Sequence, residues 1–99
     1  MMQYMKAALL ARTKEVRDDG AIVEVVIWQL QEPLAPCLHD FKYRLYYGCA
    51  GVDRVRFDNE RGKGDHRHVG SSELPYAFDG VDRLIDDFIE EVERWKREH

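Results

Sequence analysis

The amino-acid sequence predicts an α+β fold, in which an antiparallel meander sheet of four strands is covered by one C-terminal amphipathic helix. Three observations predict it. Residues 5–70 contain β-rich runs separated by turn signals, two of these runs alternate between apolar and polar residues, and residues 80–97 repeat apolar side chains at three- and four-residue steps. The alternation in residues 65–69 leaves a brief fifth strand open as an alternative.

The first two strands are expected to form a hairpin. Residues 5–16 are a mixed apolar and polar run, and residues 17–20 end in Asp-Gly, a strong tight-turn signal because glycine is free to take positive φ. Residues 22–28 are dense in β-branched and aromatic side chains, which favours a central strand. Pro33 and Pro36 then end this strand, since proline has no N–H to donate to a ladder.

The third and fourth strands, residues 40–47 and 52–58 on either side of a turn at 48–51, are expected to have one apolar and one partly basic face. Successive side chains of a strand point to opposite faces of the sheet. The apolar face is therefore expected to carry Phe41, Tyr43, Leu45, Tyr47, Val55 and Phe57. The partly basic face is expected to carry Lys42, Arg44, Tyr46, Arg54, Arg56 and Asp58.

Residues 80–97 are predicted to form the helix, with Asp79 as its N-cap and Asp82 in the place of the capping-box glutamate. Basic side chains at the C-terminal end suit the helix dipole. One apolar stripe runs along it, made of Val81, Leu84, Ile85, Phe88, Val92 and Trp95. We expect this stripe to cover the apolar face of the sheet.

Composition and length limit the classes of protein to which this chain can belong. The chain has 44% hydrophobic and 34% charged residues, which is typical of a globular protein. At 99 residues it is close to the size of one domain, so residues 1–99 are expected to form a single domain, and a homodimer or a partner is one way to complete a modest core. No apolar run approaches the roughly 20 residues that span a bilayer, and the first ten residues lack the features of a signal peptide. We therefore expect a cytoplasmic protein without membrane contact.

The two cysteines and the charge pattern add two expectations. Cys37 and Cys49 match no zinc motif in their spacing and are expected to be reduced and structural. The formal net charge is −4, but basic side chains are concentrated in residues 41–68 and acidic ones dominate from residue 73 onward. A local basic surface can therefore attract an anion despite the acidic total.

The segment from Phe57 to His68 concentrates the reactive side chains, and three interpretations of it are open. In the first, His66 and His68 are the acid–base groups of phosphodiester cleavage without a metal, because histidine titrates near neutral pH. Nearby arginine and lysine side chains then hold the phosphate and stabilise charge on its oxygens.

The second interpretation is a divalent metal bound by His66, His68 and either Asp58 or Asp65, since same-side histidines two residues apart on a strand can chelate. The cationic neighbours of these histidines argue against it. In the third interpretation the segment is a solvated polar connection whose glycines serve turn geometry alone. A long connection without regular structure is uncommon in a small domain unless it is functional, which favours a site.

Residues 55–59, Val-Arg-Phe-Asp-Asn, followed by residues 66–70, His-Arg-His-Val-Gly, resemble the TumE-type family of bacterial toxin–antitoxin systems. Residues 42–47 are similar to the strand that precedes this signature, and the resemblance extends over residues 6–94. It implies a toxin with a cognate antitoxin that is a DNA-binding regulator. The Glu-Arg-Gly-Lys-Gly-Asp stretch at 60–65 stands where many relatives carry a histidine, which argues further against a metal site.

The function expected from these observations is a metal-independent, ribonuclease-like toxin that needs no cofactor and acts on RNA. His66 and His68 share the acid–base work, Arg56 engages phosphate, and Asp58 orients a histidine or an arginine. Substrate binding is assigned to Lys42, Arg44, Tyr46, Arg54, Asn59, Arg61, Lys63 and Arg67. The alternative is a non-enzymatic module whose basic sheet face binds nucleic acid or an acidic protein.

Overall fold

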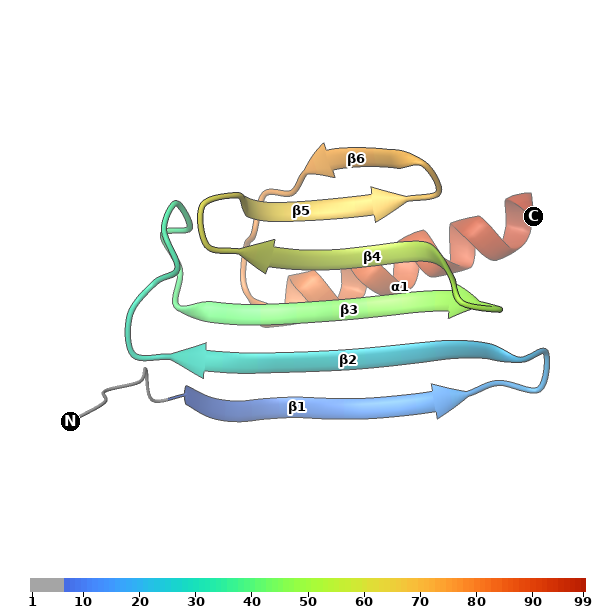
Figure 1. Ribbon diagram of the computed structural model, residues 1–99, viewed down its shortest axis with the longest axis horizontal. Coiled ribbons are helices and arrows are strands. Elements are labelled where there is room, and N and C mark those ends of the chain that lie inside the picture. The colour runs from blue at the N-terminus through green and yellow to red at the C-terminus, as the bar shows by residue number, and fades with distance from the viewer. Residues whose placement is uncertain (1–6) are drawn as a thin grey trace.

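A computed structural model describes residues 7–99 as one antiparallel sheet of six strands in chain order, followed by a single helix (Figure 1). The elements are β1 Ala7–Val16, β2 Ala21–Leu30, β3 Phe41–Cys49, β4 Val52–Glu60, β5 Gly64–Val69, β6 Ser72–Pro75 and α1 Val81–Glu98. The α+β class is confirmed, but the sheet has six strands rather than four or five. Residues 5 and 6 of the expected first strand lie outside the described residues. In the described part of the chain, no helix is long and apolar enough to cross a membrane.

β5 corresponds to the brief strand that the alternation of residues 65–69 left open as an alternative, whereas β6 follows that stretch and was not expected. β4 continues to Glu60, and β5 starts at Gly64 directly opposite it. Gly62 and Gly64 have φ values of 87° and 82°, so the chain reverses at residues that bear no Cβ penalty in this conformation. β6 is a short edge strand that ends at Pro75, where a missing N–H costs no ladder hydrogen bond.

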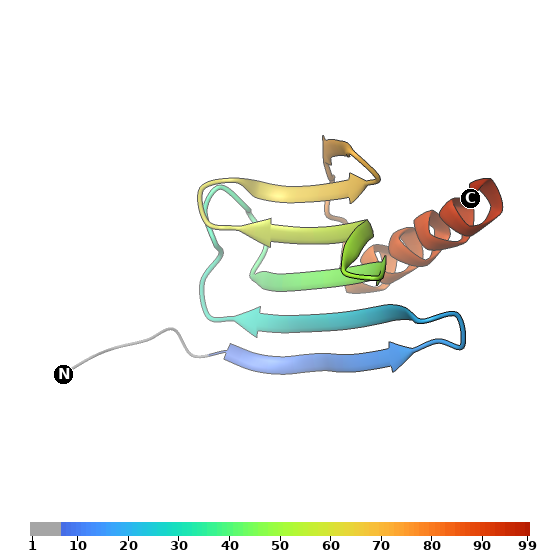
Figure 2. The ribbon, with the colours of Figure 1, turned by 45° about the vertical axis from the view of Figure 1, so that its right-hand side comes forward.

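The helix packs against β4 on one face of the sheet, leaves β1 largely exposed, and leaves the other face of the sheet open (Figure 2). Leu84, Phe88 and Val92 are buried against the sheet, so the predicted apolar stripe is confirmed. Phe88 meets Phe57 of β4 edge to face, with ring centroids 5.9 Å apart. From the sheet, the buried core contains Ala21, Ile27, Tyr43, Leu45, Tyr47, Val55 and Phe57. The apolar face expected for β3 and β4 therefore forms the core.

Two local expectations are wrong. The residue before the helix is Gly80 rather than Asp79, and it makes no side-chain capping bond; its carbonyl accepts the Leu84 N–H at 3.0 Å. In β4 the alternation is interrupted, because Tyr47 pairs with Val55 while Gly48 pairs with Asp53, leaving Arg54 as an extra residue.

This irregularity sends Arg54 to the helix side of the sheet. Its guanidinium carbon lies 5.7 Å from the centroid of the Trp95 ring of α1. It also borders a hollow of about 420 Å³ beside the end of the helix, together with Lys96 and His99. Arg54 is therefore separated from Arg56, with which strand alternation was expected to group it.

Tyr76, in the connection between β6 and α1, ties that connection to the helix. Its hydroxyl donates to Asp87 Oδ2 at 2.7 Å, and Arg83 Nε donates to Asp87 Oδ1 at 3.0 Å. Burial acts to raise the pKa of Asp87, but these two hydrogen bonds and the positive charges of Arg83 and Arg67 together outweigh it and hold the pKa of this carboxyl below its ordinary value. Its stabilising contribution is therefore present above the unfolded pKa of about 4 and is lost as the pH falls through the lowered folded pKa.

Replacing Tyr76 with phenylalanine is expected to lower the free energy of unfolding by about 1 kcal/mol at pH 7, because a partly exposed hydrogen bond to a carboxylate is lost. The difference from wild type should shrink as the pH is lowered below about 4, since Asp87 then becomes protonated in both proteins. Urea unfolding at several pH values measures this. Tyr46→Phe, on the opposite face of the sheet, is the control. A loss that is constant over the whole pH range would contradict the role given to the carboxylate.

Candidate functional site

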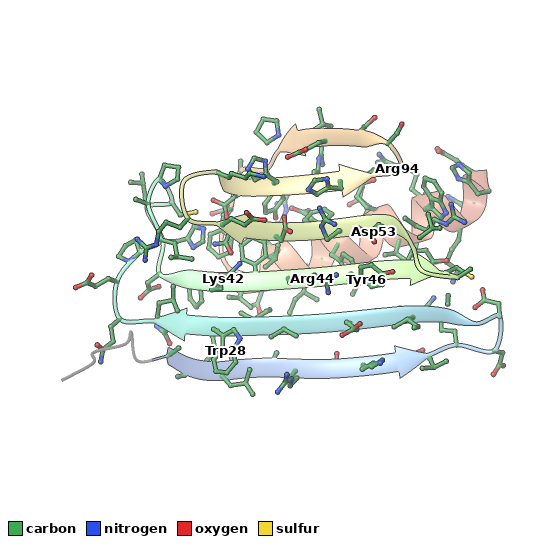
Figure 3. The ribbon with its side chains drawn as sticks, in the orientation of Figure 1. Trp28, Lys42, Arg44, Tyr46, Asp53 and Arg94 are labelled. Carbon is green, nitrogen blue, oxygen red and sulfur yellow. The ribbon has the colours of Figure 1, made fainter. Side chains whose placement is uncertain are left out.

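The sheet face opposite α1, here called the outer face, carries most of the candidate side chains (Figure 3). Cross-strand pairing aligns them in two rows that run across the strands. The first row contains Arg12, Val26, Arg44, Asp58, His66 and Pro75. The second row contains Lys14, Glu24, Tyr46, Arg56, His68 and Glu73. The two histidines are thus adjacent members of neighbouring rows.

Different hydrogen bonds fix the two imidazole rings. His66 Nε2 lies 2.8 Å from the Lys63 carbonyl oxygen, which can only accept, so Nε2 carries the proton. His68 Nε2 lies 3.0 Å from Arg56 Nη2, which can only donate, so this nitrogen accepts. In the neutral forms His66 therefore offers an unprotonated Nδ1, whereas His68 carries its proton on Nδ1.

Carboxylates lie beside both rings. Glu73 Oε1 is 3.4 Å from His66 Nδ1 and 4.0 Å from His68 Nε2, and Asp58 Oδ1 is 3.8 Å from His68 Nε2. The histidine side chains are 20% and 21% exposed, so each ring is held in place but still reaches solvent. A positive charge that forms on either imidazole is offset by a neighbouring negative charge.

Arg56 is engaged by several neighbours on the outer face. It bonds to Asp53, and its Nε lies 3.2 Å from Asp58 Oδ2, while Nη2 donates to His68. The Nε contact has ion-pair distance but lacks hydrogen-bond geometry. The charge of Arg56 is therefore largely matched by its neighbours, and its position is well defined.

The cations of β3 have fewer charged partners than Arg56. Arg44 lies over the Tyr46 ring, with 4.8 Å from its guanidinium carbon to the ring centroid, and Lys42 Nζ donates to the Asn59 carbonyl. Within residues 7–99, neither cation has a carboxylate at ion-pair distance. Trp28 of β2 pairs with Lys42, so an aromatic side chain borders the cations on the same face (Figure 3). This surface combines unmatched positive charge with aromatic rings.

Three of the residues expected to bind substrate lie away from the histidines. Arg54 faces the helix, as described above. Arg67 points to the helix side, with Nη1 3.8 Å from the carboxylate of the buried Glu91. Asn59 is fully buried, and its side chain accepts from the Tyr43 N–H at 3.0 Å and donates to the Phe41 carbonyl at 2.7 Å. Arg61 and Lys63 are exposed in the turn beside β5.

Sequence reasoning missed a second cluster, on the helix side of the sheet. Asp65 of β5 accepts hydrogen bonds from His39 Nε2 at 2.8 Å and from the Tyr43 hydroxyl at 2.6 Å, and the Cys37 thiol lies beside them. Burial and Asp65 together raise the pKa of Tyr43 and of Cys37. The Cys-x-His spacing was the available signal, but Asp65 is 26 residues away from His39, and only the fold brings them together.

The fold and the outer face define a small α+β protein in which a helix packs on one face of the sheet, while the open face carries two histidines, several cations and aromatic rings. Residues 6–96 match the family model described as Toxin TumE, and the chain therefore belongs to the TumE toxin family. The resemblance seen in the sequence is thus confirmed. Neither the curated proteins nor the solved structures gave a match.

Proposed function

We propose that this protein is a toxin that cleaves RNA on its outer face, with His66 and His68 as the acid–base pair and no metal in the reaction. Membership of the TumE family supports the toxin assignment. The observation that carries the RNA assignment is the presence of two differently bonded histidines on the face that also carries Arg56 of β4 and the cations and aromatic ring of β3. These groups are the ones that RNA cleavage without metal requires: a base, an acid and positive charge near the phosphate.

In the proposed reaction, the unprotonated Nδ1 of His66 takes the proton of a ribose 2′-hydroxyl. The 2′-oxygen forms a bond to phosphorus, and the bond from phosphorus to the 5′-oxygen breaks. The protonated His68 gives its Nε2 proton to the leaving 5′-oxygen. The products are a 2′,3′-cyclic phosphate and a 5′-hydroxyl end, and the two histidines exchange protonation states.

Arg56 connects the acid to the phosphate in this proposal. A protonated His68 Nε2 can no longer accept from Arg56 Nη2, because both groups are then donors. Protonation of His68 therefore frees one arm of the guanidinium to bond to a phosphate oxygen. Asp58 holds the other side of the guanidinium at 3.2 Å and offsets the charge of His68, which makes it an orienting residue.

Substrate binding in this proposal uses Lys42 and Arg44, which have no carboxylate partner among residues 7–99, and the turn residues Arg61 and Lys63. A base can stack on Tyr46, whose ring is held by Arg44 at 4.8 Å. Contacts between cations and phosphates release counterions, so affinity is expected to fall steeply with salt.

A toxin family also implies an antitoxin. We propose that the antitoxin is a DNA-binding regulator encoded beside this chain. A neighbouring protein that relieves growth inhibition on co-expression would identify it.

The purified protein, incubated with single-stranded RNA of mixed sequence and without added divalent metal, is expected to produce fragments that end in 2′,3′-cyclic phosphate. Attack by the 2′-hydroxyl generates this end, whereas attack by metal-activated water leaves a linear phosphate. Mass spectrometry of the products distinguishes the two. Linear ends, or an absolute requirement for added Mg²⁺ or Mn²⁺, would contradict the proposed chemistry.

Binding of RNA without any cleavage would favour the alternative, a binding module. Arg44→Gln should then weaken binding, because it removes an unmatched charge from the outer face, and the slope of log affinity against log salt should become smaller by about 0.7 to 0.9. Arg97→Gln, which removes one positive charge from the last turn of α1, is the matched control. Equal affinities for these two variants would exclude the outer face as the binding surface.

A further inference from the structure

The cluster of Cys37, His39 and Asp65 has no part in the proposed RNA cleavage. One ligand atom from each residue, a sulfur, an imidazole nitrogen and a carboxylate oxygen, lies within 4.8 Å of the other two. Cys37 is 7% exposed, and the side chains of His39 and Asp65 are 15% and 13% exposed. Cys37 and His39 come from the connection between β2 and β3, whereas Asp65 belongs to β5.

We propose that Cys37, His39 and Asp65 form a binding site for a transition-metal ion, Zn²⁺ by the chemistry of its ligands, which fastens the β2–β3 connection to β5. Thiolate, imidazole and carboxylate are the three donor types that proteins use for zinc. Mg²⁺ and Ca²⁺ prefer oxygen donors alone, so a set with sulfur and nitrogen disfavours them. Three protein ligands leave the fourth tetrahedral position to water.

The surroundings already supply partners to two of the three ligands. The Tyr43 hydroxyl donates to Asp65 Oδ1 at 2.6 Å, and Asn59 Nδ2 lies 3.8 Å from Cys37 Sγ as a weak donor. Hydrogen bonds of this kind orient ligating carboxylates and thiolates in metal sites. The His39 ring is also held, by stacking on Phe78 with a centroid distance of 3.8 Å.

Binding of the ion requires two proton movements. His39 Nδ1 accepts the Phe41 N–H at 3.2 Å, so in the metal-free protein Nε2 carries the proton that points to Asp65. Coordination through Nε2 moves this proton to Nδ1 and gives up the 3.2 Å bond. The Cys37 thiol, whose pKa is raised by burial and by Asp65, loses its proton to solvent. The ion thus replaces the hydrogen bond between His39 and Asp65 with one coordination bond to each residue.

The place of the cluster in the fold indicates a structural role. Its residues and their partners come from the β2–β3 connection, β3, β4 and β5, which meet at the same end of the sheet. Since metal binding to the folded state alone stabilises it, an ion here is expected to hold this end of the sheet together. None of the three ligands lies on the outer face, so the site and the RNA-cleaving site are separate.

The test uses the full chain, stripped of metal and titrated with Co²⁺, whose spectrum reports thiolate ligation. Wild type and Cys49→Ser are expected to show a cysteine-to-cobalt charge-transfer band at one equivalent, and Cys37→Ser is expected to lack it. The Cys49→Ser variant is the matched control, because Cys49 is the other cysteine and stands outside the cluster. His66→Ala with His68→Ala should also retain the band, which separates this site from the histidines of the outer face.

Zinc gives the second readout. Wild type is expected to bind one Zn²⁺ per chain and to melt at a higher temperature with ZnCl₂ than without, and Asp65→Asn should lose most of this shift. The absence of the cobalt band in folded Cys49→Ser overturns the proposal even if Cys37→Ser fails to fold. An equal zinc content in Cys37→Ser and Cys49→Ser overturns it as well. RNA cleavage enters neither readout, so failure here is distinguishable from failure of the proposed function.

Discussion

Replacing His66 and His68 together with alanine is expected to abolish RNA cleavage and the growth inhibition that follows from it. General acid–base catalysis contributes about 10² to 10⁴ in rate for each group, so the double variant should fall below detection while its fold is retained. Both rings lie on the outer face and contribute nothing to the buried core, which is why little loss of stability is expected. Cleavage rates and thermal melting, measured in parallel, test both statements.

The single variants test the separate roles. Wild type should show a bell-shaped dependence of kcat/KM on pH, because one histidine must be unprotonated and the other protonated. His66→Ala should remove the acidic limb of this profile, and His68→Ala the basic limb. His99→Ala is the matched control, since His99 stacks on Trp95 at the end of α1 and not on the outer face. A folded double variant that still cleaves RNA at the wild-type rate would rule out the proposed mechanism.

Replacing Asn59 with alanine is expected to lower the free energy of unfolding by about 2–5 kcal/mol, because the buried Tyr43 N–H and the partly buried Phe41 carbonyl lose their partner. The pairing of β3 with β4 ends at Arg44 and Asp58, and beyond it the Asn59 side chain bonds to the Tyr43 N–H and the Phe41 carbonyl. The amide thus continues the ladder in place of main-chain bonds. A loss of this size is a large part of the 5–15 kcal/mol that stabilises a typical domain.

Denaturant unfolding measures this loss, with Gln29→Ala as the matched control. Gln29 is an exposed amide on β2, and its removal should change the free energy of unfolding by no more than about 0.5 kcal/mol. Asn59→Asp should be as harmful as Asn59→Ala, since a carboxylate cannot donate to the Phe41 carbonyl and is itself buried. A change for Asn59→Ala as small as that for Gln29→Ala would contradict the structural role.

The regular elements could be predicted because their periodicity is strong. Six apolar side chains at helical spacing identified α1, and uninterrupted alternation placed Tyr43 and Leu45 in the core. β6 was missed because four exposed residues ending in proline show neither alternation nor a β-rich composition. The N-cap was misplaced because a glycine with positive φ precedes the helix without any side-chain bond, and this leaves no pattern in the sequence.

In the candidate site, too, some positions could be predicted from the sequence and others could not. Alternation in residues 65–69 correctly placed His66 and His68 on one face. The same rule puts the Arg67 side chain on the other face of the sheet, and it puts the side chains of Asn59 and Asp58 on different faces. The faces of Arg67 and Asn59 could therefore have been predicted from the sequence. Arg54 was not, because a single extra residue in a strand cannot be recognised without its partner strand. The contact of His39 with Asp65 depends on the whole fold.

The alignment of the outer-face residues across neighbouring strands fixes the distances between the residues that a ligand can contact. Adjacent strands lie about 4.8 Å apart, so Arg44 on β3 stands about 10 Å from His66 on β5, along a direction perpendicular to the strands. The hydrogen-bonded backbone of the sheet holds this separation rigidly, whatever the side chains do. In the proposed reaction, a polymer that crosses the strands would contact Arg44 at a fixed distance from the bond that is cleaved at the histidines, whereas a small molecule bound at one of these places would not reach the other.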